Sequence, residues 1–414
     1  MTESAALLSD LCDLISIQVD PATMPESPYL GLEHLEPGRL RATGFGRASD
    51  ATSQKAAFEP GDVLYGKLRP YLDKAVLADR AGVATTELLV LRPKLGVSPE
   101  YLACVVHSPA FVEFAMQGVT GAQHPRTSWA HVRAFELSAH DRSEQASIAK
   151  LLWSLFELRM RTEQGIASAS SLKRAAMQQL FSRGLRGEAQ KETEIGQIPE
   201  SWELVPLGDL GRIGNGSTPK RSTSAYWDGG TFPWLNSAKV YDRDIQDADQ
   251  FVTDVALKEC HLPVLEPGAV LVAITGQGKT LGNAAVLGIR ATINQHLAYL
   301  QTDLEKAEPK FVRAYLETQY DHLRAVASGG GSTKGALTCG FLRGMTVPRP
   351  PTIIEQQEIA DVLDVLDRKI ELLGSKRDVL DRLFKALLHK LMTGEISVDD
   401  LDLSTLPSID GTAA

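Results

Sequence analysis

Three kinds of feature are scarce or missing in this 414-residue sequence, and each absence argues against a class of protein. Cysteine occurs only at Cys12, Cys104, Cys260 and Cys339, without C-x-x-C spacing, which favours buried structural thiols over a zinc site or a disulfide framework. No run of about 18 apolar residues occurs, and the opening MTESAALLSDLCDL lacks the basic start and cleavage site of a signal peptide. We therefore expect a cytoplasmic protein with no membrane partner.

Positive charge is also in short supply, because the formal net charge is −9. Phosphate binding needs clustered Lys and Arg, so this charge argues at first against a nucleic-acid partner. The excess of acid is uneven, however. Residues 1–59 carry nine acidic and four basic residues, and residues 394–414 carry five acidic residues and no basic one. The middle of the chain is therefore about neutral and leaves room for a local basic face.

No pattern of a catalytic or metal site stands out. The nine histidines do not pair at ligand spacing, no G-x-S-x-G elbow occurs, and the (N/D)PP(Y/F) motif of adenine methyltransferases is missing. AVLVAITGQGKTLG at 269–282 comes nearest to a phosphate-binding loop, but Ala273 replaces its first glycine. Gly282-Asn283 and the strand-like AAVLGI follow it, where a phosphate loop needs a helix N-terminus. We interpret TGQGKT as a polar loop between two strands.

The sequence contains two similar halves. FEPGDVL at Phe58 matches LEPGAVL 207 positions later, and PEYLACVV at Pro99 matches PKFVRAYL 210 positions later. HVRAFEL matches FLRGMTV at 210, and EQASIAKLL at Glu144 matches EQQEIADVL at 211. A separation that drifts so little over some 120 positions indicates an internal duplication.

Each half combines a globular part with a long helix. The globular parts are rich in Gly and Pro with short apolar runs, which predicts mixed strands and loops with helices at 98–116 and 308–326. From Glu144 and from Glu355, apolar residues recur at intervals of three and four without proline for about 38 residues, or about 57 Å of helix. Two such helices would most simply pair antiparallel as an intramolecular coiled coil, with two separate core helices as the alternative. Gly165 and Gly374 lie near mid-helix and mark a kink or a contact.

Two phrases carry a family resemblance. PTIIEQQEIADVL leading to LHKLMTGEI, and EIGQIPESWELVPLGDLG from 194, resemble the specificity subunit of type I restriction–modification enzymes. The resemblance covers nearly the whole chain, although the first half lacks the tryptophan of the second opening and the prolines before its Glu-Gln.

The resemblance implies an α+β fold with a pseudo-two-fold internal repeat, in which two mixed α/β target-recognition domains are joined by two long antiparallel helices. It implies a chain without a catalytic site that reads a split target on double-stranded DNA. It also implies two methyltransferase subunits and restriction subunits as partners, with S-adenosylmethionine, ATP and Mg on those partners. The expected divisions are recognition domain 1–142, helix 143–187, linker 188–200, recognition domain 201–352, helix 353–393 and a disordered acidic tail 394–414.

Polar and basic loop residues at matching places of the two halves are the candidates for DNA contact, since Arg and Lys suit guanine or phosphate and Gln suits adenine. They are Lys67, Arg69, Lys74, Gln123, His124, Arg126 and Ser128 in the first half, and Lys220, Arg221, Ser237, Lys239, Gln277, Lys279, Ser332 and Lys334 in the second. The candidate partner-binding residues on the helices are Glu144, Gln145, Glu355 and Gln356. For any single residue the alternative is a solvated loop side chain. For the whole chain the alternative is a coiled-coil interaction scaffold without DNA specificity.

Overall fold

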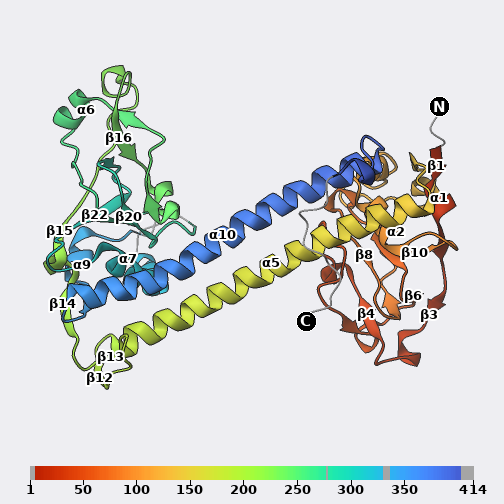
Figure 1. Ribbon diagram of the computed structural model, residues 1–414, viewed down its shortest axis with the longest axis horizontal. Helices are drawn as coiled ribbons and strands as arrows, with labels where there is room; N and C mark the ends of the chain where they lie inside the picture. Colours follow the sequence, from red (N-terminus) through yellow and green to blue (C-terminus); the bar gives the residue numbers. More distant parts are fainter. Residues whose placement is uncertain (1–4, 277, 330–335, 402–414) are drawn as a thin grey trace. The chain divides into compact units, whose positions relative to one another are not determined.

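The computed structural model describes residues 5–276, 278–329 and 336–401. The chain divides into two compact units, a first unit of Met1–Gly165 with Leu373–Ala414 and a second unit of Ile166–Leu372. The division falls inside both long helices, α5 (Arg142–Arg183) and α10 (Ile353–Met392), drawn in yellow and blue in Figure 1. Each unit therefore contains a globular module, half of the helix that follows it and half of the other helix. In the described ranges, none of the helices combines the length and apolar character of a membrane span.

The first unit is built on two small sheets and short helices. A four-stranded antiparallel sheet has the order β2-β10-β7-β8, a second sheet has the order β3-β6-β9-β4-β5, and β1 pairs with β11. The strands are β1 (Ala5–Leu7), β2 (Cys12–Ile15), β3 (Gln18–Val19), β4 (Pro28–Leu30), β5 (Gly46–Arg47), β6 (Lys55–Phe58), β7 (Val63–Gly66), β8 (Ala75–Leu77), β9 (Gly82–Ala84), β10 (Leu88–Pro93) and β11 (Glu136–Ser138). The helices are α1 (Leu8–Leu11), α2 (Pro99–His107), α3 (Pro109–Gln117) and α4 (Trp129–Val132).

The second unit repeats this plan. Its main sheet has the order β15-β22-β19-β20-β17, a smaller sheet has the order β18-β16-β21, and β14 pairs with β23. The strands are β14 (Glu203–Pro206), β15 (Gly211–Asn215), β16 (Phe232–Leu235), β17 (Asp244–Ile245), β18 (Phe251–Val252), β19 (Ala269–Ala273), β20 (Ala284–Leu287), β21 (Thr292–Ile293), β22 (Leu297–Thr302) and β23 (Thr346–Arg349). The helices are α6 (Asp254–Glu259), α7 (Pro309–Thr318), α8 (Tyr320–Gly329) and α9 (Cys339–Gly344).

The duplication predicted from the sequence is confirmed down to single hydrogen bonds. In the second sheet of each unit one strand pair is parallel, β4 with β9 in the first unit and β16 with β21 in the second. The hydroxyl groups of Ser128 and Thr338, 210 positions apart, cap α4 and α9 by accepting from the backbone N–H three residues on. A common backbone frame therefore carries two different sets of loops.

The two long helices pair antiparallel within each unit. In the first unit, the Arg159 guanidinium lies 2.9 Å from the Asp381 carboxylate, and the Leu373 side chain lies against Gly165. In the second unit, the Lys173 ammonium lies 2.7 Å from the Asp367 carboxylate. Residue numbers thus rise along α5 as they fall along α10. The antiparallel arrangement expected from the apolar periodicity is confirmed, and Gly165 is a contact point between the helices inside the continuous α5.

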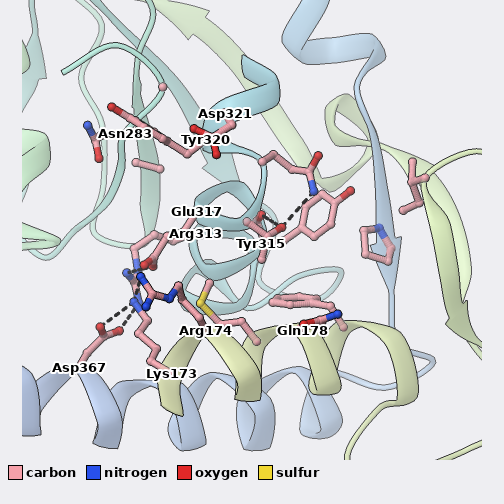
Figure 2. Close-up of a pocket in the computed structure, with 18 of the residues that line it drawn as sticks. Lys173, Arg174, Gln178, Asn283, Arg313, Tyr315, Glu317, Tyr320, Asp321 and Asp367 are labelled. Atoms are coloured by element: carbon pink, nitrogen blue, oxygen red, sulfur yellow. Dashed lines mark hydrogen bonds and ion pairs between the residues drawn. The ribbon is translucent and has the colours of Figure 1, made fainter. Parts of the chain in front are cut away.

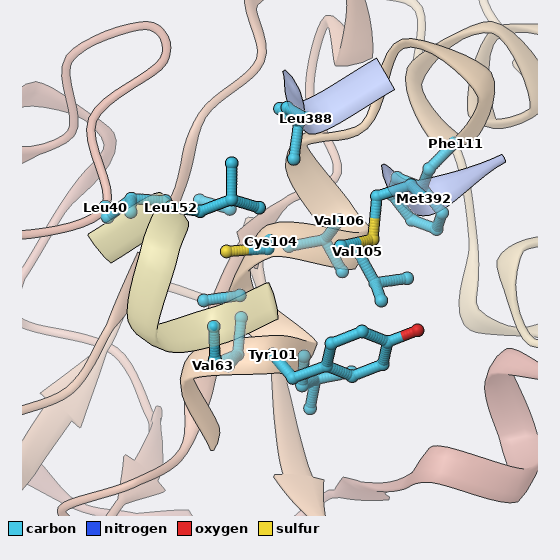
Figure 3. Close-up of a cluster of buried hydrophobic side chains, with 14 of the residues drawn as sticks. Leu40, Val63, Tyr101, Cys104, Val105, Val106, Phe111, Leu152, Leu388 and Met392 are labelled. Atoms are coloured by element: carbon cyan, nitrogen blue, oxygen red, sulfur yellow. The ribbon is translucent and has the colours of Figure 1, made fainter. Parts of the chain in front are cut away.

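The core of the first unit joins both helices to α2. Leu152 of α5, Cys104 of α2, and Leu388 and Met392 of α10 are all buried in one apolar cluster, as Figure 3 shows. Burial raises the pKa of the Cys12 thiol in the same cluster to about 12, and burial also raises the pKa of Cys104. Both thiols therefore stay protonated and serve as small apolar core residues, as expected.

Several expectations need correction. The stretches 98–116 and 308–326 each form two helices, because Ser108 ends α2 and then caps α3 with Pro109 as its first residue, and Gln319 ends α7. The expected linker 188–200 contains an antiparallel hairpin, β12 (Gln190–Thr193) with β13 (Gly196–Pro199). The expected disordered tail is ordered at its start, since Ile396, Val398 and Leu401 pack on the first core. Residues 402–414 lie outside the described residues.

Candidate nucleic-acid interface

Three loops meet at one corner of the first unit. The segment after β7 is tied to the turn before β10 by the Lys67 N–H, which donates to the Glu87 carbonyl at 3.0 Å. It is tied to the loop before α4 by the Arg69 N–H, which donates to the Pro125 carbonyl at 2.7 Å, and by the Thr127 N–H, which donates to the Lys67 carbonyl. Backbone bonds therefore bring together Lys67, Arg69, Gln123, His124 and Arg126, which are far apart in the sequence.

The same three loops meet in the second unit. The Ile274 N–H donates to the His296 carbonyl at 3.0 Å, and the Leu337 N–H donates to the Ile274 carbonyl at 2.8 Å. The bridge between Thr275 and Ala336 repeats the bridge between Leu68 and Arg126 of the first unit. Ala336 and Leu337 therefore occupy the positions that Arg126 and Thr127 occupy in the first unit. Gln277, Ser332 and Lys334 lie outside the described residues.

The TGQGKT segment is a hairpin loop, as predicted. It leaves β19 and enters β20, and these two strands pair antiparallel. The Tyr320 hydroxyl donates to the Lys279 carbonyl at 2.8 Å, and the Arg324 guanidinium donates to the carbonyls of Gly278 and Leu281. Side chains of α8 thus hold the loop through its carbonyl oxygens, whereas a phosphate loop presents backbone N–H groups at the start of a helix. The Lys279 side chain is exposed.

Some candidate side chains already have partners within their own unit. The Lys74 ammonium donates to the Leu32 carbonyl at 2.8 Å, and the Ser128 hydroxyl caps α4. The Lys239 ammonium lies 2.7 Å from Asp242, 2.6 Å from Asp247 and 3.7 Å from Asp249. The hydrogen bonds that the ammonium donates to Asp242 and Asp247 raise the pKa of Lys239, so it keeps its positive charge, and the carboxylates compensate that charge locally. These three side chains support the fold of the loops more directly than they offer groups to a ligand.

Arg126 and Arg221 are exposed yet held in place. Arg126 pairs with the Glu87 carboxylate at 3.0 Å, so the three-loop corner of the first unit presents an ordered guanidinium. Arg221 stacks over the Trp227 ring, with 3.9 Å from the guanidinium carbon to the ring centroid, and donates to Gln250. Lys220 is exposed beside it, and Ser237 is half-buried in a 3₁₀ turn after β16.

Other exposed residues at these loops were missed by the sequence reasoning. Tyr71 projects from a turn whose flanking residues, Arg69 and Asp73, both have positive φ angles (53° and 49°), a backbone form that costs free energy outside glycine. In the second unit Gln295 and His296 are exposed in the turn before β22. Aligning INQHLAYL with ATTELLVL, 209 positions earlier, would have placed this pair beside the predicted loops.

The candidate partner-binding residues require a correction. Gln145 and Gln356 are buried, and their amides donate to the carbonyl of His140 in the loop before α5 and to the carbonyl of Lys306 in the loop before α7. Glu144 accepts from the Asp141 N–H, and Glu355 accepts from the indole N–H of Trp202 at 3.2 Å. The Glu-Gln pairs therefore fix each helix start to its own module, because polar groups buried there need hydrogen-bond partners. Trp202, the tryptophan of the IPESW phrase, is fully buried.

A cavity of about 760 Å³ in the second unit is bordered by α5, α7, α8 and the β12–β13 hairpin. Figure 2 shows Lys173, Arg313, Glu317 and Asp367 gathered at one end of it. Arg243 joins them with its guanidinium against Asp367 and 3.3 Å from Asp364. Burial opposes the charge on Arg243, but Asp367, Glu371 and Asp244 together raise its pKa. The basic and acidic side chains here neutralise one another. Because they come from α5, α10 and the globular module, their ion pairs join the two long helices to that module.

Comparison with known proteins gives consistent results. Residues 199–382 match the family model described as the type I restriction modification DNA specificity domain. The chain is 25% identical over 387 residues to a putative type I restriction enzyme MjaX specificity subunit of Methanocaldococcus jannaschii, covering 90% of this chain and 87% of that protein. It is 30% identical over 209 residues to the MjaIX specificity subunit of the same organism, covering 49% of this chain and 47% of that protein.

Two solved structures share the fold. A type I restriction–modification S subunit from M. genitalium is 15% identical with a TM-score of 0.63, covering 94% of this chain and 96% of that one. A chain described for complex assembly and conformational transition of the type I R-M system is 20% identical with a TM-score of 0.55, covering 95% and 98%.

We expect Arg243→Met to destabilise the protein by about 3 kcal/mol, the low end for removing one partner of a buried ion pair, because Lys173 and Arg313 still face Asp367. Urea unfolding measures this free energy, and Arg290→Met is the control because its pair with Glu266 is exposed. Equal stability of the two variants would show that the cluster does not hold the helices to the module.

The same variant should be more sensitive to acid. Burial opposes ionisation of Asp364, but Lys310, Arg368 and Arg243 together lower its pKa. The stability that this carboxylate contributes is therefore present above the pKa of a free carboxyl group and is lost as pH falls through the lowered value. Without Arg243 that value rises, so the loss should begin at higher pH.

Proposed function

We propose that this chain, which belongs to the family of type I restriction–modification DNA specificity subunits, reads a split DNA target and carries no catalytic site itself. The observation that carries the proposal is the repeated three-loop corner, one in each unit, with the same backbone bonds and different side chains. A common frame with different side chains suits the reading of two different half-sites. The alternative, a scaffold without DNA specificity, gives no reason for paired corners of this kind.

The side chains at the corners suit DNA chemistry. In the first unit, the exposed side chains of Gln123, His124 and Arg126 stand on a loop held at both of its ends. In the second unit, Lys279 is exposed at the corner, and Arg221 is exposed in the loop that follows β15. Hydrogen-bonding side chains specify bases, while cations neutralise phosphates and position the protein.

The partners in this proposal are a methyltransferase and, through it, restriction subunits. S-adenosylmethionine, ATP and Mg would belong to those subunits. The part of α10 in the second unit offers a docking surface, because Val365 (65% exposed) and Leu372 (72%) lie seven residues apart. Residues seven apart share one face of a helix, and an exposed apolar face of this kind is typical of packing against a further helix.

The proposal predicts two methyltransferase subunits per chain, one for each half. Replacing Val365 and Leu372 by Glu should leave one of them bound, because the apolar face in the second unit would become charged. Native mass measurement of the co-purified complex gives the count. Leu95→Glu is the control, since Leu95 is 99% exposed and lies outside the helices. A wild-type complex that saturates at one methyltransferase would contradict the prediction.

Lys279→Ala should weaken DNA binding and lower the salt dependence by about one counterion if the ammonium contacts a phosphate. Fluorescence anisotropy with a target duplex at several salt concentrations measures both. Lys306→Ala is the control, because that lysine of the same unit pairs with Asp303 and lies outside the three-loop corner. If both variants keep the wild-type affinity and salt slope, the hairpin loop is not part of the interface.

The helices should act as the ruler for the target. Selection from a randomised duplex library should return two specified blocks around a spacer of fixed length. Four residues inserted after Gly165 and after Leu372 lengthen each helix by about 6 Å, or roughly two base pairs. We therefore expect a spacer longer by one or two base pairs and unchanged blocks, whereas a four-residue insertion in the loop at Leu95 should change neither. A folded double-insertion variant that keeps the original spacer would show that the spacer is set elsewhere.

A further inference from the structure

Gln295 lies at the tip of a tight turn just before β22. The Asn294 side-chain oxygen accepts from the His296 N–H at 3.0 Å, and the Asn294 carbonyl accepts from the Leu297 N–H at 3.3 Å. The His296 carbonyl accepts in turn from the Ile274 N–H of the neighbouring loop. Both ends of the turn are therefore fixed, and the turn is part of the three-loop corner of the second unit.

The Gln295 side chain is fixed as well. The Thr218 hydroxyl donates to Gln295 Oε1, and Gln295 Nε2 lies 3.3 Å from His296 Nε2. An amide nitrogen can only donate, so His296 Nε2 is the acceptor and the ring proton lies on Nδ1. That proton points to the Thr275 hydroxyl oxygen. Four side chains from three loops thus form one directional chain of hydrogen bonds.

These hydrogen bonds leave the Gln295 amide with one unused donor and one unused acceptor. A glutamine amide has two N–H donors and two acceptor sites, and the contacts with Thr218 and His296 use one of each. The side chain is exposed, so one N–H and one oxygen lone pair of the same amide remain available to a ligand. In the major groove adenine offers a matching pair, the N7 acceptor and the N6 amino donor.

We propose that Gln295 reads an adenine in the half-site contacted by the second unit. This proposal rests on the proposed function, because it names one base of the DNA target that the chain would read. Holding the amide before DNA arrives avoids the ordering cost that a free, rotamer-rich side chain would bear on binding. Thr218, His296 and Thr275 act as positioning residues.

The first unit supports this assignment by contrast. The same turn occurs at residues 85–88, where the Leu88 N–H donates to the Thr85 carbonyl at 3.0 Å. Thr86 is exposed at the position of Gln295, and Glu87 takes the position of His296 and pairs with Arg126. The backbone of the turn is repeated while its side chains differ, as expected if each copy reads a different base.

The test is selection from a duplex library with two randomised blocks, using the full chain together with its co-purified partners. Wild type should prefer adenine at one position by about 5- to 150-fold, the range for a good bidentate contact. Gln295→Ala should remove the preference at that position alone, and Gln295→Glu should shift it to cytosine, because a carboxylate only accepts and cytosine offers an amino donor. Thr218→Val should reduce the preference for adenine without changing the base.

The block read by the first unit reports on folding, since it should be identical for every variant. Gln197→Ala, at an exposed glutamine of the β12–β13 hairpin, is the matched control and should change no position. The proposal is overturned if Gln295→Ala and Gln295→Glu both keep every base of a split target. If wild type itself selects no split target, the proposed function fails instead, so the two failures are distinguishable.

Discussion

The antiparallel pairing of α5 with α10 is the constraint on which the rest of the structure depends. The first unit is completed by Leu380, Phe384, Leu388, Leu391 and Met392, which come from the far end of the chain. Burying five such side chains contributes roughly 8–15 kcal/mol at about 1.5–3 kcal/mol each, an upper estimate. That amount is comparable to the whole stability of a typical domain. Neither module therefore has a complete core without the helix of the other half, and the two halves must fold as one chain.

Because the frame carries the stability, the loops are free to differ. Ser128 and Thr338 cap equivalent helices, Gln145 and Gln356 tie equivalent helix starts to their modules, and Thr85 and Asn294 begin equivalent turns. These contacts use backbone partners, so they survive changes at the neighbouring exposed positions. The hairpin loop of the second unit is held by α8, whereas Asp73 beside the corresponding loop of the first unit is held by buried His107 at 2.7 Å. The two units thus share one backbone arrangement but hold their loops with different side-chain contacts.

Features that depend on local sequence patterns were predictable from the sequence, and features created by strand pairing were not. The apolar periodicity predicted both long helices, and Gly282-Asn283 predicted that TGQGKT is a loop between strands. The clustering of Gln295 with Thr218 and Thr275 depends on which strands are neighbours, and no local pattern contains that information. Nor does the sequence reveal that Gln145 and Gln356 are buried, because a polar helix start is normally solvated and only the tertiary fold brings the carbonyls of His140 and Lys306 onto these amides.

The distribution of charge separates specificity from bulk affinity. Much of the positive charge near the helices is compensated internally, as for Lys173, Arg243 and Arg313 around Asp367, and Lys239 is surrounded by three carboxylates. A chain of net charge −9 that neutralised many phosphates would need a broad basic face, and these pairs remove cations that would otherwise form one. The exposed hydrogen-bonding side chains at the corners are instead suited to base edges. If the chain reads DNA in this way and assembles with the proposed partners, most of the salt-dependent attraction to the phosphate backbone must come from those partners, and the chain itself determines at which DNA sequence the complex binds.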